Sequence, residues 1–400
     1  MKKENNNARL HIGLFGRRNT GKSSVINRLT GQNLSIVSDI AGTTTDPVKK
    51  AVEIPGLGAV VVIDTAGIDD AGELGQQRIN KSLQAVKQVD MAIVVLCENR
   101  FSDEEKQLVR QLQQLQVPFV FLHNKSDENP ADKSFAKQLK ENYDVDFVDF
   151  SAKTGENLDK LLQILQKNLP DSFNKLPPLF ADKVKAGDMV LFITPIDTEA
   201  PAGRLILPQV QAIREALDFN CVAVVLKETE VKDFIEHTSI IPALVITDSQ
   251  LFGKIDKIIP SDIPLTSFSI LLARQKGNFK EFLKGTPQID KLQNGDRVLI
   301  MESCTHHSTC DDIGRVKIPR WLHEYTGRTF EYDVLPGLTE PPRPISEYAL
   351  VIQCGGCMIT HRQLQNRIQI AIDAKVPITN YGMAIAYTKG SWKRSVEMFL

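Results

Sequence analysis

The feature that most constrains the fold is the segment GRRNTGKS at residues 16–23, which follows an apolar run at residues 10–15. It matches G-x-x-x-x-G-K-[ST], in which glycines let backbone N–H groups curve around phosphate oxygens at the start of a helix. A strand, loop and helix of this kind belong to a mainly parallel α/β sheet. The motif predicts that Lys22 reaches the β- and γ-phosphates of a nucleotide and that Ser23 ligates Mg²⁺. The residues expected to bind the nucleotide here are Gly16, Asn19, Thr20, Gly21, Lys22, Ser23 and Ser24.

Three further motifs follow apolar runs, each where a parallel strand is expected to end. Asp64, at the end of the first run, is expected in the Mg²⁺ shell, and the N–H of Gly67 is expected to meet the γ-phosphate. The segment NKSD, with Asn124, Lys125 and Asp127, carries a carboxylate that accepts from both donors of guanine, which predicts GTP specificity. The last motif, expected to close over the base, consists of Ser151, Ala152 and Lys153. Ligands of open α/β sheets bind at this edge, so the motifs predict one nucleotide site.

The rest of the chain divides by its pattern of apolar runs. Strands are expected at 10–15, 59–63, 91–96, 119–122 and 147–150, with helices at 107–115 and 158–165 between them. The segment LPDSFNKLPP at 169–178 holds three prolines and reads as a linker. Beyond it we expect strands at 189–193, 221–226 and 243–246 and helices at 209–217 and 231–237, then strands at 297–301 and 348–353 and a helix at 360–374. The expected fold class is therefore α/β throughout, with domains at 8–170, 181–268 and 269–400 and a linker at 171–180.

The net charge and the hydropathy of the chain argue against nucleic acid and membrane partners. The 48 Lys and Arg residues against 49 Asp and Glu residues leave a net charge of -1, so we expect no nucleic acid partner. The longest apolar runs, 91–97 and 221–226, fall far short of the roughly 18 residues that a membrane helix needs. The opening MKKENNNARL lacks the apolar stretch of a secretory signal. We therefore expect a cytoplasmic protein without a membrane partner.

The six cysteines fall into two groups. Cys97 and Cys221 lie at the ends of apolar runs and are expected to be small buried residues. Cys354 and Cys357 enclose two glycines directly after an expected strand, and Cys304 follows another. If these two strands are neighbours in one sheet, three thiolates converge at its carboxyl edge.

The residues alone leave three chemistries open for these thiols: a redox pair, structural zinc or an iron–sulfur cluster. A redox pair is the weakest, because two glycines stand between the cysteines. Zinc needs four closed ligands, which Cys304, Cys354 and Cys357 would complete with His306 or Cys310. A cluster held by three thiolates and a weak fourth ligand fits equally well.

The order of the nucleotide motifs resembles that of translation-factor-type GTPases. The segment GTTTD at 42–46 is similar to the GTTRD switch of the tRNA-modification and ribosome-assembly branch, with Thr45 in place of Arg. The resemblance implies that Thr44 meets Mg²⁺ and the γ-phosphate and that Asn19 helps to bind an activating K⁺. Ile68 stands where Ras-like proteins carry a water-orienting Gln, and Glu73 is our candidate for that role. The expected catalytic residues are Lys22, Thr44, Gly67 and Glu73.

The chain combines this GTPase domain with a small central α/β domain and a terminal CxH…CxxC domain. This combination resembles the HydF family, the maturation GTPases of FeFe-hydrogenase. The resemblance implies a 4Fe-4S cluster on Cys304, Cys354 and Cys357. It also implies a dimerising central domain, hence a homodimer. Many members have His before the CxxC motif, but Gln353 stands here, which leaves the fourth iron site open or held by His306.

The same resemblance implies a function. The resemblance implies that the protein is a scaffold or carrier that assembles a diiron precursor and delivers this cargo to apo FeFe-hydrogenase. It also implies the radical-SAM maturases of the same pathway as partners. The alternative is a tRNA-modification or ribosome-assembly GTPase with a structural zinc or redox CxxC domain.

Overall fold

The structure, a computed structural model, describes residues 9–31, 48–65, 67–68, 82, 84–170, 176–195, 205–303 and 312–400. The chain divides into two compact units, Met1–Lys175 and Leu176–Leu400. Within the described ranges, no helix combines the length and the apolar character needed to cross a membrane.

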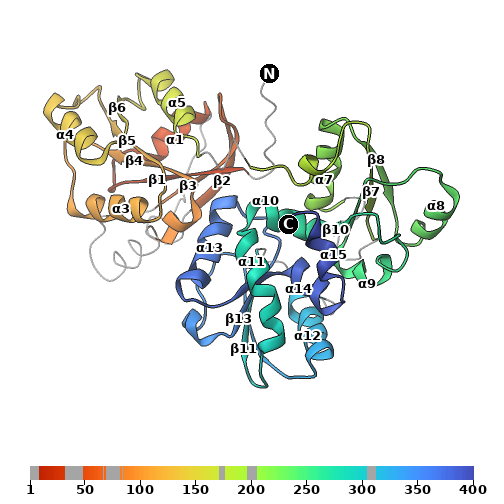
Figure 1. Cartoon of the computed structure of the whole chain (residues 1–400). Coiled ribbons are helices and arrows are strands. Elements are labelled where there is room, and N and C mark those ends of the chain that lie inside the picture. Colours follow the sequence, from red (N-terminus) through yellow and green to blue (C-terminus); the bar gives the residue numbers. More distant parts are fainter. Residues whose placement is uncertain are drawn as a thin grey trace. The chain divides into compact units, whose positions relative to one another are not determined.

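The first unit is built on a six-stranded sheet of order β2-β3-β1-β4-β5-β6 (Figure 1). Its strands are β1 (Leu10–Phe15), β2 (Val48–Ile54), β3 (Gly58–Asp64), β4 (Met91–Leu96), β5 (Phe119–Asn124) and β6 (Phe147–Phe150). All neighbours are parallel except β2 and β3, which are antiparallel. The mainly parallel α/β sheet is thus confirmed. Strand β2 was not predicted, because its adjacent Lys49 and Lys50, together with Glu53, give this half-exposed edge strand a weak apolar signal.

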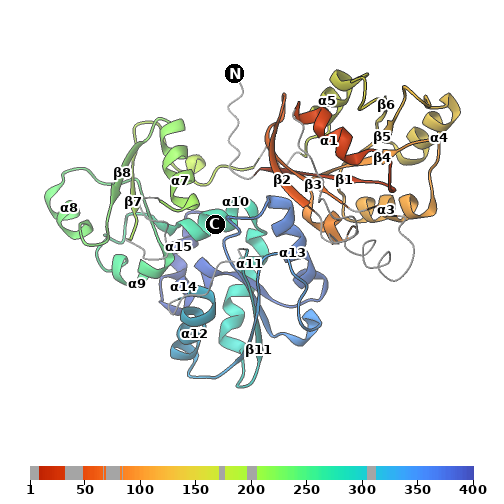
Figure 2. The same ribbon diagram turned by 180° about the vertical axis from the view of Figure 1, so that it is seen from behind.

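Helices cover both faces of this sheet. One face packs against α1 (Lys22–Thr30) and α5 (Leu158–Lys167), and the other against η1 (Val86–Gln88), α3 (Asp103–Gln114) and α4 (Lys133–Tyr143) (Figures 1 and 2). Strands β1, β4 and β5 are nearly continuous in apolar residues, as expected where both faces are covered. The sheet therefore presents one free carboxyl edge, where α1 begins.

The second unit holds two four-stranded parallel sheets. The central sheet has the order β10-β9-β7-β8, and the C-terminal sheet has the order β12-β11-β13-β14. The strands are β7 (Met189–Ile193), β8 (Val222–Leu226), β9 (Leu244–Thr247), β10 (Leu265–Ser267), β11 (Arg297–Met301), β12 (Glu331–Leu335), β13 (Leu350–Gln353) and β14 (Ile378–Asn380). The α/β fold class is therefore confirmed in both sheets. Strands β10, β12 and β14 were not expected: β10 and β14 have only three residues each, and β12 is mostly polar or half-buried.

The helices of the second unit follow the strands in the βα manner. Those around the central sheet are η2 (Ala181–Lys183), α7 (Leu207–Asp218), α8 (Val231–His237), η3 (Ser249–Leu251), α9 (Phe252–Ile255) and α10 (Phe268–Lys276). Those around the C-terminal sheet are α11 (Phe279–Gly285), η4 (Thr286–Lys291), η5 (Ile313–Lys317), α12 (Ile318–Thr326), η6 (Ile345–Glu347), α13 (His361–Asp373), α14 (Tyr381–Thr388) and α15 (Trp392–Glu397).

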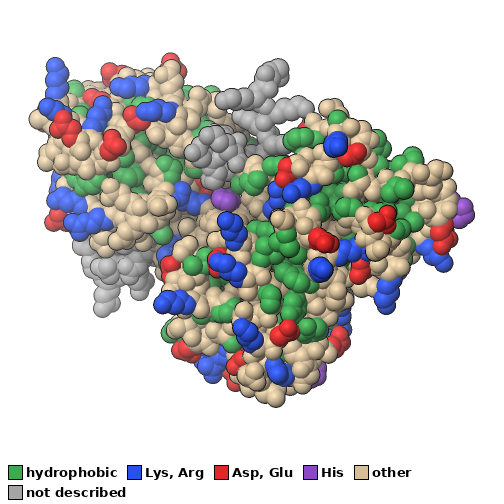
Figure 3. Space-filling model, in the orientation of Figure 1, with side chains coloured by type: hydrophobic (Ala, Val, Ile, Leu, Met, Phe, Trp, Pro, Cys, Tyr) green, Lys and Arg blue, Asp and Glu red, His purple; other side chains and the backbone are tan. Residues whose placement is uncertain are grey.

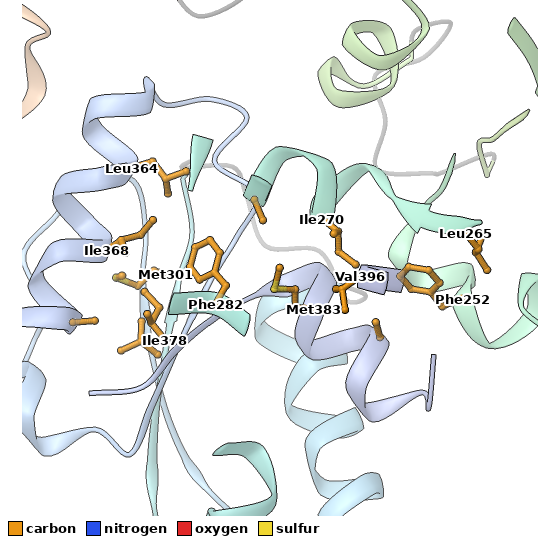
Figure 4. Close-up of a cluster of buried hydrophobic side chains, with 14 of the residues drawn as sticks. Phe252, Leu265, Ile270, Phe282, Met301, Leu364, Ile368, Ile378, Met383 and Val396 are labelled. Carbon is orange, nitrogen blue, oxygen red and sulfur yellow. The ribbon is translucent and has the colours of Figure 1, made fainter. Parts of the chain in front are cut away.

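The two sheets of this unit share one hydrophobic core. Figure 4 shows Ile368 of α13 beside Met301 of β11, and Phe252 of α9 at the other end of the cluster, with Met383 of α14 between them. All four side chains are buried. A shared core explains why the two sheets form one compact unit. The boundary expected at residue 268 falls at the start of α10 and stays a prediction.

The segment expected to be a linker is firmly held at its end. Leu179 and Phe180 are buried, and the backbone N–H groups of Leu179, Phe180 and Ala181 donate to the carboxylate of Glu215 at 2.8–3.0 Å. Residues 171–175 lie outside the described ranges. The second unit therefore begins by residue 179.

Candidate functional site

The phosphate loop connects β1 to α1, as the motif predicts. Gly16 has a φ of 150°, and a Cβ there would lie 2.3 Å from the carbonyl oxygen of Val95. The backbone at Gly21 is left-handed, and a Cβ there would lie 2.3 Å from Nδ2 of Asn124. Both positions therefore require glycine. Lys22 Nζ donates to the carbonyls of Gly16 and Arg17 at 2.9 and 2.8 Å, so its ammonium lies at the mouth of the loop.

A hydroxyl and a carboxylate meet beside the loop. Ser23 Oγ donates to Oδ2 of Asp64 at 3.1 Å, across the ends of α1 and β3. The other carboxylate oxygen, Oδ1, is buried and has no hydrogen-bond partner among the described residues. Burial raises the pKa of Asp64, and the nearby Lys22 and the Ser23 hydrogen bond oppose this shift. An unpartnered carboxylate oxygen next to a hydroxyl is a donor set that fits Mg²⁺.

The segment after β3 is described only at its start. Gly67 is half-buried, and Ile68 is buried in the core with its N–H donating to the Gly16 carbonyl at 3.4 Å. A buried Ile68 cannot orient a water. Thr44 and Glu73, the other two residues expected to be catalytic, lie outside the described ranges.

The base-binding motifs meet at the same edge. Asn124 Nδ2 donates to the carbonyl of Thr20 at 2.8 Å, and its Oδ1 accepts from the N–H of Ala152 at 3.0 Å, so this one side chain joins three loops. Ser151 Oγ donates to Asp127 at 2.7 Å, and this hydrogen bond lowers the pKa of the exposed carboxyl. The hydrogen bond therefore favours the ionised form of Asp127, the form that the predicted guanine contact needs.

A cavity of about 850 Å³ lies between these loops. It is lined by Gly21, Ser24, Asn27, Arg28, Gly31, Asn124, Lys125, Asp127, Glu128, Ala152, Lys153 and Leu158. Of the remaining expected residues, Thr20 is fully buried and Asn19 is exposed with a φ of 61°. The structure therefore brings together the described residues that were predicted to bind the nucleotide, from the phosphate loop and the ends of β3, β5 and β6.

The sequence analysis missed an ion pair behind the phosphate loop. Arg17 Nε lies 3.0 Å from Glu105 of α3, and both side chains are buried. The same carboxylate accepts from the N–H of Ser102 at 2.6 Å, and Arg17 also donates to the carbonyl of Cys97 at 3.3 Å. This pair fixes one side of the loop to the first turn of α3. The two partners are 88 residues apart in the chain, so no short sequence motif could predict their contact.

Two of the expected metal ligands lie at the carboxyl edge of the C-terminal sheet. β11 and β13 are parallel neighbours, with Met301 opposite Gln353. The N–H of Cys354 donates to the carbonyl of Met301 at 2.9 Å. Ser303 contacts the thiol directly: its N–H donates to Cys354 Sγ at 3.1 Å, and its Oγ lies 2.8 Å from that sulfur. The condition for convergence, that the two strands are neighbours, is therefore met.

Cys304 and His306 themselves lie outside the described ranges, as do His307, Cys310 and Asp311. Among the residues that the structure describes, no group of three or more His, Cys, Asp or Glu side chains is placed to hold a metal. Ser303, a residue that the sequence analysis did not single out, ends the described part of this segment next to Cys354.

The loop of Cys354 and Cys357 holds two thiols on either side of a tight turn. Gly356 is left-handed with a φ of 70°, which turns the chain between the two sulfurs. Burial raises the pKa of the Cys357 thiol, the Cys354 thiolate raises it further, and Lys276 lowers it. Gln353 is fully buried, and its Nε2 donates to the Cys354 carbonyl at 3.1 Å and lies 3.4 Å from its sulfur. Two thiols with amide and hydroxyl donors beside them fit a thiolate-bound iron–sulfur cluster.

The remaining cysteines behave as expected. Cys97 and Cys221 are buried, with 5% and 6% of their surface exposed, and burial raises the pKa of both thiols. Their prediction as small buried residues is confirmed.

Comparison with known proteins gives three family matches. Residues 280–398 match the family described as hydrogen maturase F tetramerization domain, and residues 179–277 match the hydrogen maturase F dimerization domain. Residues 11–125 match the 50S ribosome-binding GTPase family.

Relatives of known name match a smaller part of the chain. GTPase Der of Wolinella succinogenes is 29% identical over 183 residues, which are 44% of this chain and 39% of that protein. The tRNA modification GTPase MnmE of Hydrogenovibrio crunogenus is 34% identical over 161 residues, which are 40% of this chain and 35% of that protein. The chain thus spans less than two-fifths of the length of either relative.

Among solved structures, Aquifex aeolicus Era bound to GDP and AlF4⁻ matches 54% of this chain and 92% of its own, at 22% identity and a TM-score of 0.36. That similarity is too low to bear on function. The two hydrogen maturase F models, by contrast, together match more than half of the chain and leave the GTPase motifs on the N-terminal side. The chain therefore belongs to the hydrogen maturase F family, the GTPases of hydrogenase maturation.

Proposed function

We propose that this GTPase is an iron–sulfur scaffold that assembles or carries a diiron precursor and delivers it to apo FeFe-hydrogenase. The observation that carries the proposal is Cys354, which is hydrogen-bonded to Ser303 at the end of the neighbouring strand, in a region that matches a hydrogen maturase F model. The radical-SAM maturases of the pathway would supply the precursor. The cytoplasmic location stays a prediction from the sequence.

The nucleotide site supports Mg²⁺-dependent GTP hydrolysis. Backbone N–H groups of the phosphate loop would bind the phosphates, and Lys22 would leave its two carbonyl partners to neutralise the β- and γ-oxygens. Ser23 and Asp64 would hold Mg²⁺, which supplies charge stabilisation when bound. Thr44, Gly67 and Glu73 keep their proposed roles at the γ-phosphate and the attacking water.

We also propose that K⁺ activates hydrolysis through Asn19. This residue is exposed on the phosphate loop, and its left-handed backbone presents it at the surface. Replacing K⁺ with Na⁺ at constant ionic strength should lower the rate of phosphate release. In Asn19→Ala the two salts should give equal, low rates. Equal rates in the wild-type protein would contradict the role of K⁺.

The cluster would be held by Cys304, Cys354 and Cys357, with His306 as a candidate fourth ligand. In this arrangement the chain contributes the thiolates, the Ser303 and Gln353 donors beside Cys354, and a shell of apolar side chains around Cys357. Hydrogen bonds to sulfur and burial are the means by which a protein adjusts the potential of a cluster. The cluster would supply the attachment point for the diiron cargo.

Anaerobic reconstitution with iron and sulfide tests this part of the proposal. We expect an S = 1/2 electron paramagnetic resonance signal on reduction in the wild-type protein, and its loss in Cys304→Ser. Cys221→Ser is the matched control, since that thiol is buried and bonds only to carbonyls among the described residues. Bound zinc in place of iron in the wild-type protein would contradict the proposal and favour a structural zinc domain.

The central sheet supports a homodimer. β8 is an edge strand that pairs only with β7 among the described strands, and its Val222 and Val225 are 53% and 42% exposed. Leu217 in the last turn of α7 and Phe219 directly after that helix are also exposed. Hydrophobic side chains gather on the surface of this part in Figure 3. An apolar edge strand is a template for pairing with a second chain, and residues 179–277 match a dimerization domain.

Sedimentation tests the homodimer. Val225→Glu should shift the protein toward monomer at micromolar concentration, because a charge would be buried in the pairing edge. Val316→Glu, an exposed residue of the C-terminal region, is the control. A wild-type protein that is monomeric throughout this range would contradict the proposal.

The alternative, a tRNA-modification or ribosome-assembly GTPase, rests on the Der and MnmE relatives. Those relatives match 44% and 40% of this chain, whereas both maturase models match its second unit. Salt-dependent binding of RNA by the purified protein would favour the alternative.

A further inference from the structure

A lysine is buried in the second unit without a partner. Lys276, the last residue of α10, has 2% of its surface exposed, and its Nζ has no hydrogen-bond partner among the described residues. A buried ammonium without a partner destabilises a fold, because the charge has lost its hydration and nothing replaces it. A buried ammonium group of this kind is expected where a bound anion or another negative charge offsets its positive charge.

Lys276 lies on the side of α10 that covers the loop of Cys354 and Cys357. A Cβ at Gly355 would lie 3.4 Å from Leu272 and 3.7 Å from Ser269, so this loop rests on α10. Ser269, Leu272 and Lys276 are three and four residues apart and therefore share one face of the helix. Cys357 packs against the apolar cluster that contains Leu272.

The electrostatic surroundings of Lys276 point the same way. Burial lowers its pKa, and the one charged group that opposes this shift, among the described residues, is the Cys357 thiolate. In return, Lys276 lowers the pKa of that thiol. The lysine and the sulfur thus act on each other in a buried environment.

A second buried cation makes the contrast clear. Arg367 of α13 interacts with the charge of Cys354, but its guanidinium also donates to the carbonyls of Glu302, Leu335 and Gly337. It therefore joins the ends of β11 and β12 and has a structural task. Lys276 has no such contacts in the part of the chain that the structure describes.

We propose that Lys276 is a positioning residue for an anionic cluster on the cysteine thiolates, to which its ammonium supplies a counter-charge and a hydrogen-bond donor. The inference rests on the proposed iron–sulfur function. Three thiolates give an oxidised 4Fe-4S core a net negative charge, and reduction adds another. A fixed positive charge in a low-dielectric site favours the reduced form, because net charge and hydrogen bonds to sulfur set the potential.

The first experiment measures the midpoint potential of the reconstituted cluster in the full-length protein. Lys276→Met should lower the equilibrium constant for reduction about tenfold or more, a shift of about 59 mV to lower potential for one electron. Lys276→Arg keeps the charge and should remain closer to wild type. The control is Lys284→Met on α11, since that side chain is 72% exposed and pairs with Glu281 at 2.6 Å. An unchanged potential in Lys276→Met with an intact spectrum would overturn the inference and leave the proposed function standing.

The second experiment compares the stability of the apo and cluster-loaded forms. Without a cluster, Lys276→Met should unfold at higher denaturant concentration than wild type, because an uncompensated buried charge is removed. With the cluster, the same variant should lose iron to a chelator several times faster. A lysine with a structural partner would give the opposite result in the apo protein, namely destabilisation, and that outcome would also overturn the inference. Zinc in the wild-type site would overturn both this inference and the proposed function.

Discussion

The nucleotide site and the cysteine site both lie at carboxyl edges of parallel sheets, yet they are assembled in different ways. In the first, side chains from short motifs bond to nearby loops, as Asn124 does to Thr20 and Ala152. In the second, the thiols depend on residues from distant elements, and Lys276 has no hydrogen-bond partner among the described residues. The described groups of the nucleotide site are thus mostly joined by hydrogen bonds within the protein, whereas the proposed metal site keeps a buried charge that an anionic occupant would offset.

The largest expected effect concerns the nucleotide site alone. Lys22→Ala should lower the rate of GTP hydrolysis by roughly 10²–10³-fold, because it removes a preorganised donor at the transferring phosphate. Iron content after reconstitution should not change, because the cysteines lie in the other compact unit. Phosphate release and iron per chain are the measurements, with the exposed Lys137→Ala as control. Loss of iron in Lys22→Ala would contradict the separation of the two sites.

The reciprocal variant tests the cysteine site. Cys354→Ser should weaken cluster retention by more than the roughly 10–100-fold that a residue behind a ligand contributes, since a ligand is lost. GTP hydrolysis should stay within about twofold of wild type. Iron retained during chelator challenge is the measurement, and Cys221→Ser is the control. Equal retention in Cys354→Ser and wild type would remove this residue from the ligand set.

The buried ion pair behind the phosphate loop gives a smaller effect on stability. Glu105→Ala leaves Arg17 buried without its carboxylate and should destabilise the first unit by about 3 kcal/mol. Asp103→Ala on the same helix removes an exposed pair with Lys106 and should change the stability far less. Calorimetric unfolding of the first unit distinguishes them. Similar values for both variants would show that the loop does not depend on this pair.

The smallest effect is a pH dependence at the base-binding end. The Ser151 hydrogen bond lowers the pKa of Asp127, so Ser151→Ala should raise it. Guanine recognition needs the ionised carboxylate, which is present above the pKa and lost as the pH falls through it. GTP affinity should therefore be nearly unchanged at neutral pH and decline at a higher pH in Ser151→Ala than in wild type. Ser126→Ala, which loses only a contact with Glu156 among the described residues, is the control for affinity titrations in mildly acidic buffer. Identical profiles would contradict the role of this hydrogen bond.

Some features of the first unit were predictable from the sequence and others were not, for a physical reason. The phosphate loop was predictable because its function requires glycines, a lysine and a hydroxyl at fixed spacing along one turn of backbone. Glu105 was not predictable, because an acidic residue in the first turn of a helix is ordinary and only packing brings it to Arg17. Edge strand β2 was not predicted for a related reason: Lys49, Lys50 and Glu53 interrupt its apolar residues, so it shows no continuous apolar run.

By itself the sequence determined the α/β class, the buried state of Cys97 and Cys221, and the resemblance to the maturase family, and it predicted the residues that would bind the nucleotide. Each depends on local spacing or on apolar runs, which the order of residues records directly. Only the tertiary structure decided that β11 and β13 are neighbours, that Ser303 contacts the Cys354 sulfur, and that Lys276 is buried beside the loop of Cys357. Those facts depend on strand order and on the packing of α10, and they bring together residues 51 or more positions apart in the chain.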